Sequence, residues 1–356
     1  MAGGKGVILA YRKTQPSGED GMAMQYLRMF DYIRRHAIPA LPYLTLRKVL
    51  NLCVGQVELR LRRTRTYSTP AYMKIESTPL CHLSCGGCAH SSKEYKKSLR
   101  NNMHLTVERV AEITRTIESN LIGVSLSYSG EPMLNRALPD IIAYLHQKKI
   151  STSFATNLSV PLSEASTEAL VKSGLDLILV SLDGMSSETY LKYRKGGNYQ
   201  LVLDNVARIA RTKERLGRKR PILTLKMIIF PHNQHEVPVA KKRWRALGFD
   251  AVEFDMDHGA LAAAGADVVN KKRMVRKKKP CFWAWTAPVI GWDGDVQPCC
   301  KQMNQISLGN AVTHNLKSIW RGDNFASLRA GFSFKNYGTD MHPVCRQCVG
   351  LGDESV

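Results

Sequence analysis

Residues 81–88 read Cys-His-Leu-Ser-Cys-Gly-Gly-Cys and place three thiols, Cys81, Cys85 and Cys88, close together. They follow a short strand expected at residues 72–76, so they are predicted to lie on a loop. Three thiolates can hold three irons of a four-iron cluster and leave the fourth iron open to another ligand. A structural zinc site needs a fourth ligand, which His82 or His90 could supply. The stretch therefore predicts a metal centre, with an open four-iron cluster favoured over zinc.

A repeated strand-then-helix pattern begins at this stretch and continues to about residue 258. The predicted strands are residues 72–76, 123–126, 150–154, 177–180, 223–229 and 251–254. Between them, apolar residues recur at helical spacing, for example after a Thr106 cap. Such alternation is typical of a parallel sheet. Six units are too few for the closed eight-stranded barrel, so we expect an α/β fold with a partial (β/α)6 TIM-like barrel, whose chemistry lies at the carboxyl ends of the strands.

The cysteine stretch and its place after the first strand resemble the radical S-adenosylmethionine (radical SAM) superfamily, over about residues 72–258. The resemblance implies that S-adenosylmethionine binds the open iron of a [4Fe–4S] cluster held by Cys81, Cys85 and Cys88. It also implies a reducing partner such as a flavodoxin or ferredoxin, and cleavage of the cofactor to a 5′-deoxyadenosyl radical that takes a hydrogen atom from a substrate. Gly87 departs from the family, which usually has an aromatic residue near the adenine here. The adenine contact is therefore expected from elsewhere in the chain.

Residues after the next three strands match positions that this family uses around the cofactor. Gly130 and Glu131 resemble the Gly-Glu-Pro element that meets the amino group, because glycine allows close backbone approach and an acidic group or a carbonyl suits an ammonium. Asn157 follows the third strand. Ser181 and Arg194 resemble a segment that contacts the cofactor carboxylate, which suits a guanidinium. The alternatives are an ordinary turn, a structural serine and a solvent-facing arginine.

The catalytic candidates follow the sixth predicted strand: Asp255, Asp257 and His258. Acidic and imidazole groups at the carboxyl ends of barrel strands are suited to substrate contact or proton transfer. The alternative is that these residues cap local turns.

The last quarter of the chain carries a second group of cysteines. It resembles the SPASM or twitch type of extension, in which a first cysteine opens the domain, another follows a glycine, here Gly294, and a late pair closes the site. The resemblance implies an auxiliary [4Fe–4S] cluster held by Cys281, Cys299, Cys345 and Cys348. Cys300 is the alternative to Cys299, and structural zinc is the alternative metal. A hairpin turn at residues 293–294 between residues 289–290 and 296 would bring the first two cysteines together.

Charge and composition complete the domain prediction. The 356 residues carry a formal net charge of +21, concentrated in basic runs at residues 60–65 and 271–279. Such runs point to a phosphorylated substrate, an anionic membrane surface or a nucleic acid, or are simply solvated. The predicted segments are 1–21, disordered or before the true start; 22–70, a basic helical extension; 71–258, the barrel; 259–280, a basic linker; and 281–356, the small C-terminal iron–sulfur domain.

These features predict a cytoplasmic enzyme, because no apolar run is long enough to span a bilayer and no signal pattern opens the chain. The basic runs also allow a location at the periphery of a membrane. Its expected substrate is an unidentified anionic or phosphorylated small molecule, or a lipid-linked one. The alternative within the family is a peptide- or protein-modifying maturase, although residues 22–65 look too short and too helical for a leader-peptide-binding domain. The alternative from another class is a non-catalytic zinc protein that binds RNA.

Overall fold

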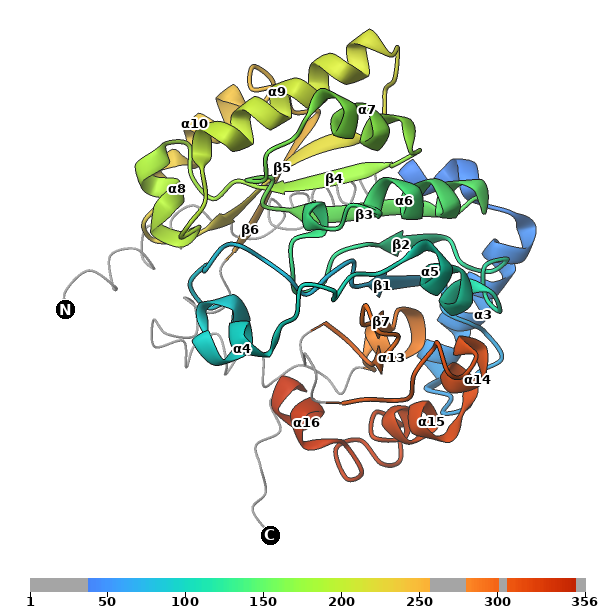
Figure 1. The fold of residues 1–356 in the computed structure, drawn as a ribbon. Helices are drawn as coiled ribbons and strands as arrows, with labels where there is room; N and C mark the ends of the chain where they lie inside the picture. Colours follow the sequence, from blue (N-terminus) through green and yellow to red (C-terminus); the bar gives the residue numbers. More distant parts are fainter. Residues whose placement is uncertain (1–37, 257–279, 301–305, 350–356) are drawn as a thin grey trace, which may run out of the picture.

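The computed structural model describes residues 38–256, 280–300 and 306–349. One eight-stranded sheet runs through this part of the chain in the order β6-β5-β4-β3-β2-β1-β7-β8 (Figure 1). Its strands are β1 (Tyr72–Ile75), β2 (Gly123–Ser125), β3 (Ser151–Thr156), β4 (Leu177–Ser181), β5 (Ile222–Ile229), β6 (Ala251–Met256), β7 (Val289–Ile290) and β8 (Val296–Gln297). All six strands predicted for the barrel are confirmed, and β1 to β6 are parallel.

Helices connect these strands and cover the sheet, as the partial-barrel prediction requires. They are α4 (Lys93–Ser98), α5 (Val107–Thr114), α6 (Leu138–Gln147), α7 (Glu164–Lys172), α8 (Ser187–Tyr193), α9 (Tyr199–Arg215) and α10 (Val237–Arg243). Thr106 caps α5 as predicted, because its side chain accepts a hydrogen bond from the backbone N–H of Arg109. The core between sheet and helices is fully buried and apolar, with Phe154, Ile113 and Ile142 among its members.

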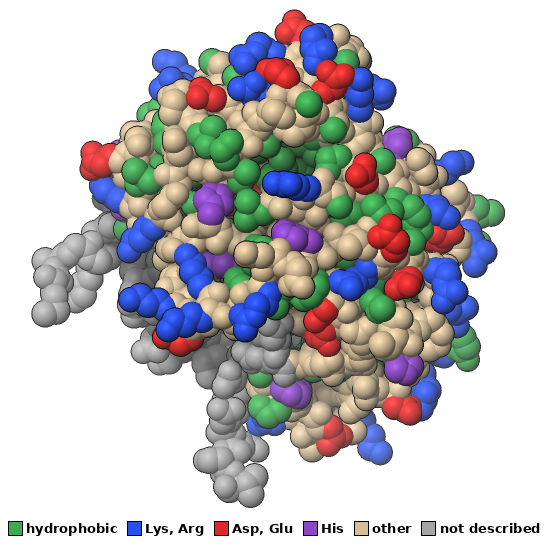
Figure 2. All heavy atoms as spheres, in the orientation of Figure 1, with side chains coloured by type: hydrophobic (Ala, Val, Ile, Leu, Met, Phe, Trp, Pro, Cys, Tyr) green, Lys and Arg blue, Asp and Glu red, His purple; other side chains and the backbone are tan. Residues whose placement is uncertain are grey.

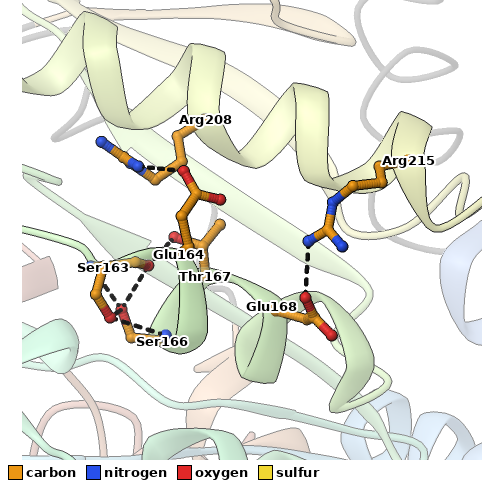
Figure 3. Close-up of polar contacts among 7 residues, drawn as sticks. All are labelled: Ser163, Glu164, Ser166, Thr167, Glu168, Arg208 and Arg215. Carbon is orange, nitrogen blue, oxygen red and sulfur yellow. Dashed lines mark hydrogen bonds and ion pairs between the residues drawn. The ribbon is translucent and has the colours of Figure 1, made fainter.

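The pair α7 and α9 shows how the barrel helices divide their faces. Val202, Val206 and Ile209 of α9 lie in the core. Its outer residues are charged: Arg208 pairs with Glu164, and Arg215 Nη2 lies 2.7 Å from Glu168 Oε2 (Figure 3). The apolar face therefore points inward and the charged face outward, which is the usual arrangement for a surface helix.

Helix α3 (Leu46–Leu61) has the opposite arrangement. The sequence predicts an amphipathic helix here from the helical spacing of Leu46, Leu50, Val57 and Leu61, and the helix is present. Yet all four of these side chains are exposed. The preceding 3₁₀ helix η1 (Ile38–Tyr43) packs instead at the amino ends of the strands, where the Tyr43 hydroxyl donates to Asp176. The predicted helices within residues 22–37 and the expectation for residues 1–21 lie outside the described residues.

The C-terminal residues extend the barrel sheet rather than forming a sheet apart. Strand β7 pairs in parallel with β1 and in antiparallel with β8, which confirms the predicted hairpin. Gly294 in its turn has φ of 92°, a conformation that favours glycine. Around this hairpin lie α13 (Phe282–Thr286), α14 (Leu316–Arg321), α15 (Asp323–Ala330) and α16 (Pro343–Val349). The pairing fixes the C-terminal cysteines relative to the loop that follows β1.

Candidate active site

The three cysteines of residues 81–88 lie on the loop between β1 and α4, at the carboxyl ends of the parallel strands. The end of α8 holds this loop: the backbone N–H of Ser84 donates to the Lys195 carbonyl at 2.9 Å, and that of Gly86 to the Tyr193 carbonyl at 3.4 Å. Gly87 has φ of 74°, and a side chain there would meet no atom within 4 Å. The positive φ of Gly87 therefore favours glycine over the aromatic residue usual in the family, whereas the space around it would admit a side chain.

Each thiol of this loop has a different polar neighbour. Asn157 Nδ2 lies 3.8 Å from Cys81 Sγ, Arg194 Nη1 lies 3.8 Å from Cys85 Sγ, and His90 Nδ1 lies 3.5 Å from Cys88 Sγ.

These neighbours and burial shift the thiol pKa values in different directions. Burial raises the pKa of Cys81 to about 12 and outweighs Arg194 in raising that of Cys85. The hydrogen bond with His90 lowers the pKa of Cys88. Three partly buried thiols, each with its own polar neighbour, can each supply one thiolate to a different iron of a cluster. The donor set at residues 81–88 thus fits the predicted group.

Gly130 and Glu131 lock the loop after β2 onto the cysteine loop. A Cβ at Gly130 would lie 2.2 Å from the Thr78 carbonyl oxygen, so only glycine allows this approach. The Glu131 carboxylate is buried and accepts hydrogen bonds from the Thr156 hydroxyl at 2.5 Å and the Asn157 N–H at 2.7 Å. Because its oxygens are already used inside the protein, the Glu131 side chain has a structural role here.

Arg194, one of the predicted carboxylate partners, is bound to an aspartate that the sequence analysis did not assign. Its Nε and Nη2 atoms each lie 2.6 Å from Asp183 Oδ2, and Asp183 is fully buried. The second carboxylate oxygen of Asp183 accepts from the Ile228 N–H at 2.6 Å. Arg194 is therefore not solvent-facing, and its remaining nitrogen, Nη1, points toward Cys85. Ser181 ends β4 on the same side of the sheet as Lys226, with which it pairs in register.

An aromatic group lies beside Gly86, which precedes Gly87, the position that is usually aromatic in the family. A side chain at Gly86 would lie 3.9 Å from the ring of Tyr193. The Tyr193 ring packs on Phe230 with centroids 4.4 Å apart, and Phe230 stacks on His232 at 5.2 Å. The sequence analysis missed these residues because they come from two separate strand–helix connections.

Of the catalytic candidates, only Asp255 is described; Asp257 and His258 lie outside the described residues. Asp255 was predicted to follow the sixth strand, and that position is wrong: β6 runs on to Met256, so Asp255 lies inside the strand and pairs with Ile228 of β5. Asp255 Oδ2 lies 3.7 Å from Lys226 Nζ, and Glu253 Oε1 lies 4.0 Å from the same atom. Lys226, Glu253 and Lys74 were missed by the sequence analysis. The available signal was a charged residue inside an otherwise apolar strand, as in Ile222–Ile229.

The C-terminal cysteines come from three segments. Cys281 precedes α13, Cys299 and Cys300 follow β8, and Cys345 and Cys348 lie one turn apart on α16. The pKa of Cys345 is raised to about 12, first by burial and then by the nearby thiols of Cys281, Cys299 and Cys348. Cys300 instead contributes to the raised pKa of the Tyr128 phenol, and Cys299 contributes to the raised pKa values of both Tyr128 and Cys345. The other three thiols of the predicted set thus lie near enough to Cys345 to act on it, although within the described residues no three His, Cys, Asp or Glu side chains are close enough together to hold a metal ion.

A polar wall of four side chains, Tyr95, Glu76, Ser129 and Tyr128, lies between the two cysteine sets. The Ser129 hydroxyl donates to Glu76, and Ser129 and Glu76 both lie close enough to Tyr95 to act on the pKa of its phenol. Burial raises the pKa values of Glu76 and Tyr128. The Tyr128 hydroxyl donates to Gln297 Oε1 of β8 at 3.1 Å. At the other end, Tyr95 lies edge-on to His90, with ring centroids 5.0 Å apart.

Two family models match this chain in the regions just described. The model of the radical SAM superfamily matches residues 75–238, and that of the SPASM iron–sulfur cluster-binding domain matches residues 281–349. The chain therefore belongs to the radical SAM superfamily. More particularly, it is a radical SAM enzyme with a C-terminal SPASM domain, whose cofactors are S-adenosylmethionine and [4Fe–4S] clusters.

Comparisons with single proteins give distant similarities. The tungsten-containing aldehyde ferredoxin oxidoreductase cofactor-modifying protein of Pyrococcus furiosus is 20% identical over 318 residues, covering 78% of this chain and 86% of that protein. The GTP 3′,8-cyclase of Alkaliphilus metalliredigens is 27% identical over 166 residues, covering 47% of this chain and 50% of that protein. The chain thus matches only about half the length of this cyclase.

Among solved structures, Streptococcus suis SuiB bound to precursor peptide SuiA has a TM-score of 0.58 at 16% identity, covering 78% of this chain and 70% of that chain. The enzyme anSMEcpe with bound AdoMet has a TM-score of 0.55 at 15% identity, covering 80% of this chain and 88% of that chain. These likenesses confirm the predicted fold. In the part of the chain that the structure describes, no helix is long and apolar enough to cross a membrane.

Proposed function

We propose that this enzyme abstracts a hydrogen atom from an anionic, phosphorylated small molecule held between its two cysteine sets. When bound, the catalytic cluster and S-adenosylmethionine supply a 5′-deoxyadenosyl radical, and the auxiliary cluster supplies an acceptor for an electron. Cys81, Cys85 and Cys88 would hold the first cluster, and Cys281, Cys299, Cys345 and Cys348 the second. The observation that carries the proposal is the polar wall that lies between the two sets.

The residues around the first set have separate roles in this proposal. Arg194, fixed by Asp183, orients the Cys85 thiolate and keeps the loop closed on α8. The backbone carbonyls of the Gly130 loop, rather than the occupied Glu131 carboxylate, would meet the cofactor amino group. Tyr193 and Phe230 would supply the adenine contact that Gly87 does not provide.

Cations on the barrel strands and on α4 favour an anionic substrate. Lys226 lies between two carboxylates at 3.7 and 4.0 Å, which is longer than a close ion pair, so a phosphate could compete for it. Lys74 lies on the face of β1 opposite to the core residues Met73 and Ile75. Outside the wall, Figure 2 shows Lys and Arg side chains gathered over α4, and Lys96 Nζ donates to Ser84 of the cysteine loop. The positive potential of these Lys and Arg side chains raises the local concentration of anions. The name of the matched GTP 3′,8-cyclase also states a phosphorylated substrate.

The test is an anaerobic assay of 5′-deoxyadenosine formation with dithionite as the reductant. Nucleotides, sugar phosphates and peptides are added in turn to the reconstituted protein. We expect 5′-deoxyadenosine in the wild type and in Cys53→Ala, whose exposed thiol on α3 belongs to neither set, and none when Cys81, Cys85 and Cys88 are all changed to Ala. Phosphorylated small molecules should accelerate its formation.

The variant Lys226→Gln tests the proposed substrate without testing the class of enzyme. It should weaken the acceleration by a phosphorylated compound about tenfold or more, since one charged contact is lost, and leave the basal rate in place. Stimulation by peptides alone would overturn the anionic small-molecule proposal in favour of a peptide-modifying enzyme. Absence of 5′-deoxyadenosine from a protein with full iron would contradict the assignment of the first cysteine set.

A further inference from the structure

The outer face of α3 is apolar along its whole length. Leu46 is 75% exposed, Leu50 56%, Val57 51% and Leu61 55%. Positions spaced by four, seven, eleven and fifteen residues lie on one side of an α-helix, so these side chains form a continuous stripe. Leu41, just before the helix, is 56% exposed as well. We call these five residues the α3 stripe. A connected apolar patch of this kind on a folded protein marks an interaction surface.

Three polar residues of α3, Lys48, Asn51 and Glu58, face inward, and they hold the helix in this orientation. Lys48 Nζ donates to the Lys149 carbonyl at 2.5 Å, and Asn51 exchanges two hydrogen bonds of 2.9 Å with the backbone of Thr69. Glu58 is buried and accepts from the Tyr67 N–H at 2.5 Å.

Arg62, just after the helix, continues this buried polar row. It is buried and donates to the Phe332 carbonyl at 3.2 Å. Turning the helix over would leave all these buried partners unsatisfied, at a cost in each case. The outward position of the α3 stripe is therefore built into the fold.

Charge distinguishes among the partners that could cover this stripe. Glu58 is the only acidic residue of Leu46–Leu61, and it is turned inward. The exposed charged residues beside the stripe are cations, Arg47 and Arg60, followed by Arg63 beyond the helix end. An apolar helix face whose own exposed charged residues are all cations suits the surface of an anionic bilayer, where the apolar side chains enter the acyl boundary and the arginines meet the headgroup phosphates. The formal net charge of +21 adds long-range attraction to such a surface.

The helix also has the right shape and place for this role. It lies at the periphery of the described fold (Figure 1), and its sixteen residues span roughly 24 Å. Its first turn contacts the amino ends of the strands, through Lys48 with Lys149 before β3 and Arg47 with Asn120 before β2. The cysteine loop lies at the carboxyl ends of the same strands. A surface contact through α3 would thus leave the candidate active site free.

We propose that the α3 stripe docks this enzyme onto an anionic membrane surface. The proposal is independent of the substrate proposed above, since none of the stripe residues belongs to either cysteine set or to the polar wall.

The experiment is cosedimentation of the full-length, reconstituted enzyme with vesicles of equal parts phosphatidylcholine and phosphatidylglycerol, and with vesicles of phosphatidylcholine alone. We expect binding to the anionic vesicles that weakens as salt is added. Replacing Leu46, Leu50 and Val57 together by Ser should weaken binding at least about tenfold, because each side chain loses its apolar contact with lipid. Arg60→Gln combined with Arg63→Gln should weaken binding to the anionic vesicles and not to the neutral ones.

Val239→Ser on α10 is the control, because Val239 is an exposed apolar residue on a different helix. It should bind vesicles like the wild type. All variants should keep basal 5′-deoxyadenosine formation, which shows that they are folded. Equal vesicle binding by the triple variant and the wild type would overturn the proposal, as would no binding by the wild type. A wild-type dimer that dissociates in the triple variant, seen by light scattering without vesicle binding, would assign the stripe to pairing between copies instead.

Discussion

The two cysteine sets are assembled in opposite ways. Cys81, Cys85 and Cys88 lie on one loop, so their spacing in the sequence already brings them together. Cys281, Cys299 and the α16 pair come from three segments and meet only because β7 pairs with β1 and the chain then folds back. The difference teaches that a local ligand set can be recognised from spacing, whereas a dispersed one depends on the packing of its domain.

The surroundings of the two sets differ as well. In the first, three polar side chains from different strand–helix connections each approach one thiol. In the second set, burial and the other thiols raise the pKa of Cys345. We therefore expect the first set to depend on its polar neighbours and the second on the packing of the domain.

The largest expected effect is the separate loss of each cluster. Anaerobically reconstituted wild type should hold about eight irons per chain, and the variant with Cys81, Cys85 and Cys88 changed to Ala about four. Changing Cys345 and Cys348 to Ser should also leave about four, but with 5′-deoxyadenosine formation retained. Iron and sulfide analysis measures this, with Cys53→Ala as control. About four irons in the wild type, all lost in the first variant, would point to zinc at the second set.

The next effect concerns the buried pair beside the first set. Arg194→Leu leaves the Asp183 carboxylate buried without its partner, which costs about 3–5 kcal/mol of stability. Arg215→Leu breaks an exposed pair with Glu168 and should cost little. Thermal unfolding of the two variants measures the difference as a much larger fall in Tm for Arg194→Leu. Equal shifts in Tm would show that Arg194 is not held as the structure describes.

Neighbouring cysteines allow a sharper test of the second set. Cys299→Ala should lose iron from the C-terminal domain, because Cys299 lies near Cys345. Cys300→Ala should keep all of its iron. The thiols that raise the pKa of Cys345 are those of Cys281, Cys299 and Cys348, whereas the Cys300 thiol raises the pKa of Tyr128. Iron analysis and electron paramagnetic resonance of the two variants distinguish them. The reverse result would exchange the two assignments.

The smallest effect is a pH dependence from Glu76, in the wall between the sets. Burial raises its pKa above the ordinary 4.5, so the fold disfavours the carboxylate. The resulting loss of stability is absent below the unfolded pKa and grows as pH rises through the folded pKa. The Tm of Glu76→Gln relative to the wild type should therefore increase as pH rises from the ordinary pKa of 4.5 toward neutrality.

Glu168→Gln is the comparison for this measurement. The pKa of Glu168 is lowered to about 2 by its bonds with Lys172 and Arg215. The stability that the ionised Glu168 carboxylate contributes is fully present above the unfolded pKa, and it is lost only as pH falls toward the folded pKa. The Tm difference for Glu168→Gln should thus stay constant over the same pH range. Parallel curves for the two variants would contradict the burial of Glu76.

The sequence by itself determined the elements and the first cysteine set. Apolar periodicity and turn residues are local signals, so the six strands, the Thr106 cap and the hairpin at Gly294 were predicted close to where they lie. The metal-binding character of residues 81–88 was equally local. The same signal predicted α3 as a helix but could not give its orientation, because periodicity shows that a helix has two faces and not which one is buried.

Only the tertiary structure decided the orientation of α3, the occupied Glu131 carboxylate, the Asp183 partner of Arg194 and the wall between the two cysteine sets. Each depends on atoms far apart in the chain. Burial and hydrogen bonding between distant residues set which polar groups are already satisfied, and that information is not present in any single stretch of sequence. The residues recognised by spacing therefore define the class of enzyme, and the long-range contacts define what remains available to a substrate or a surface.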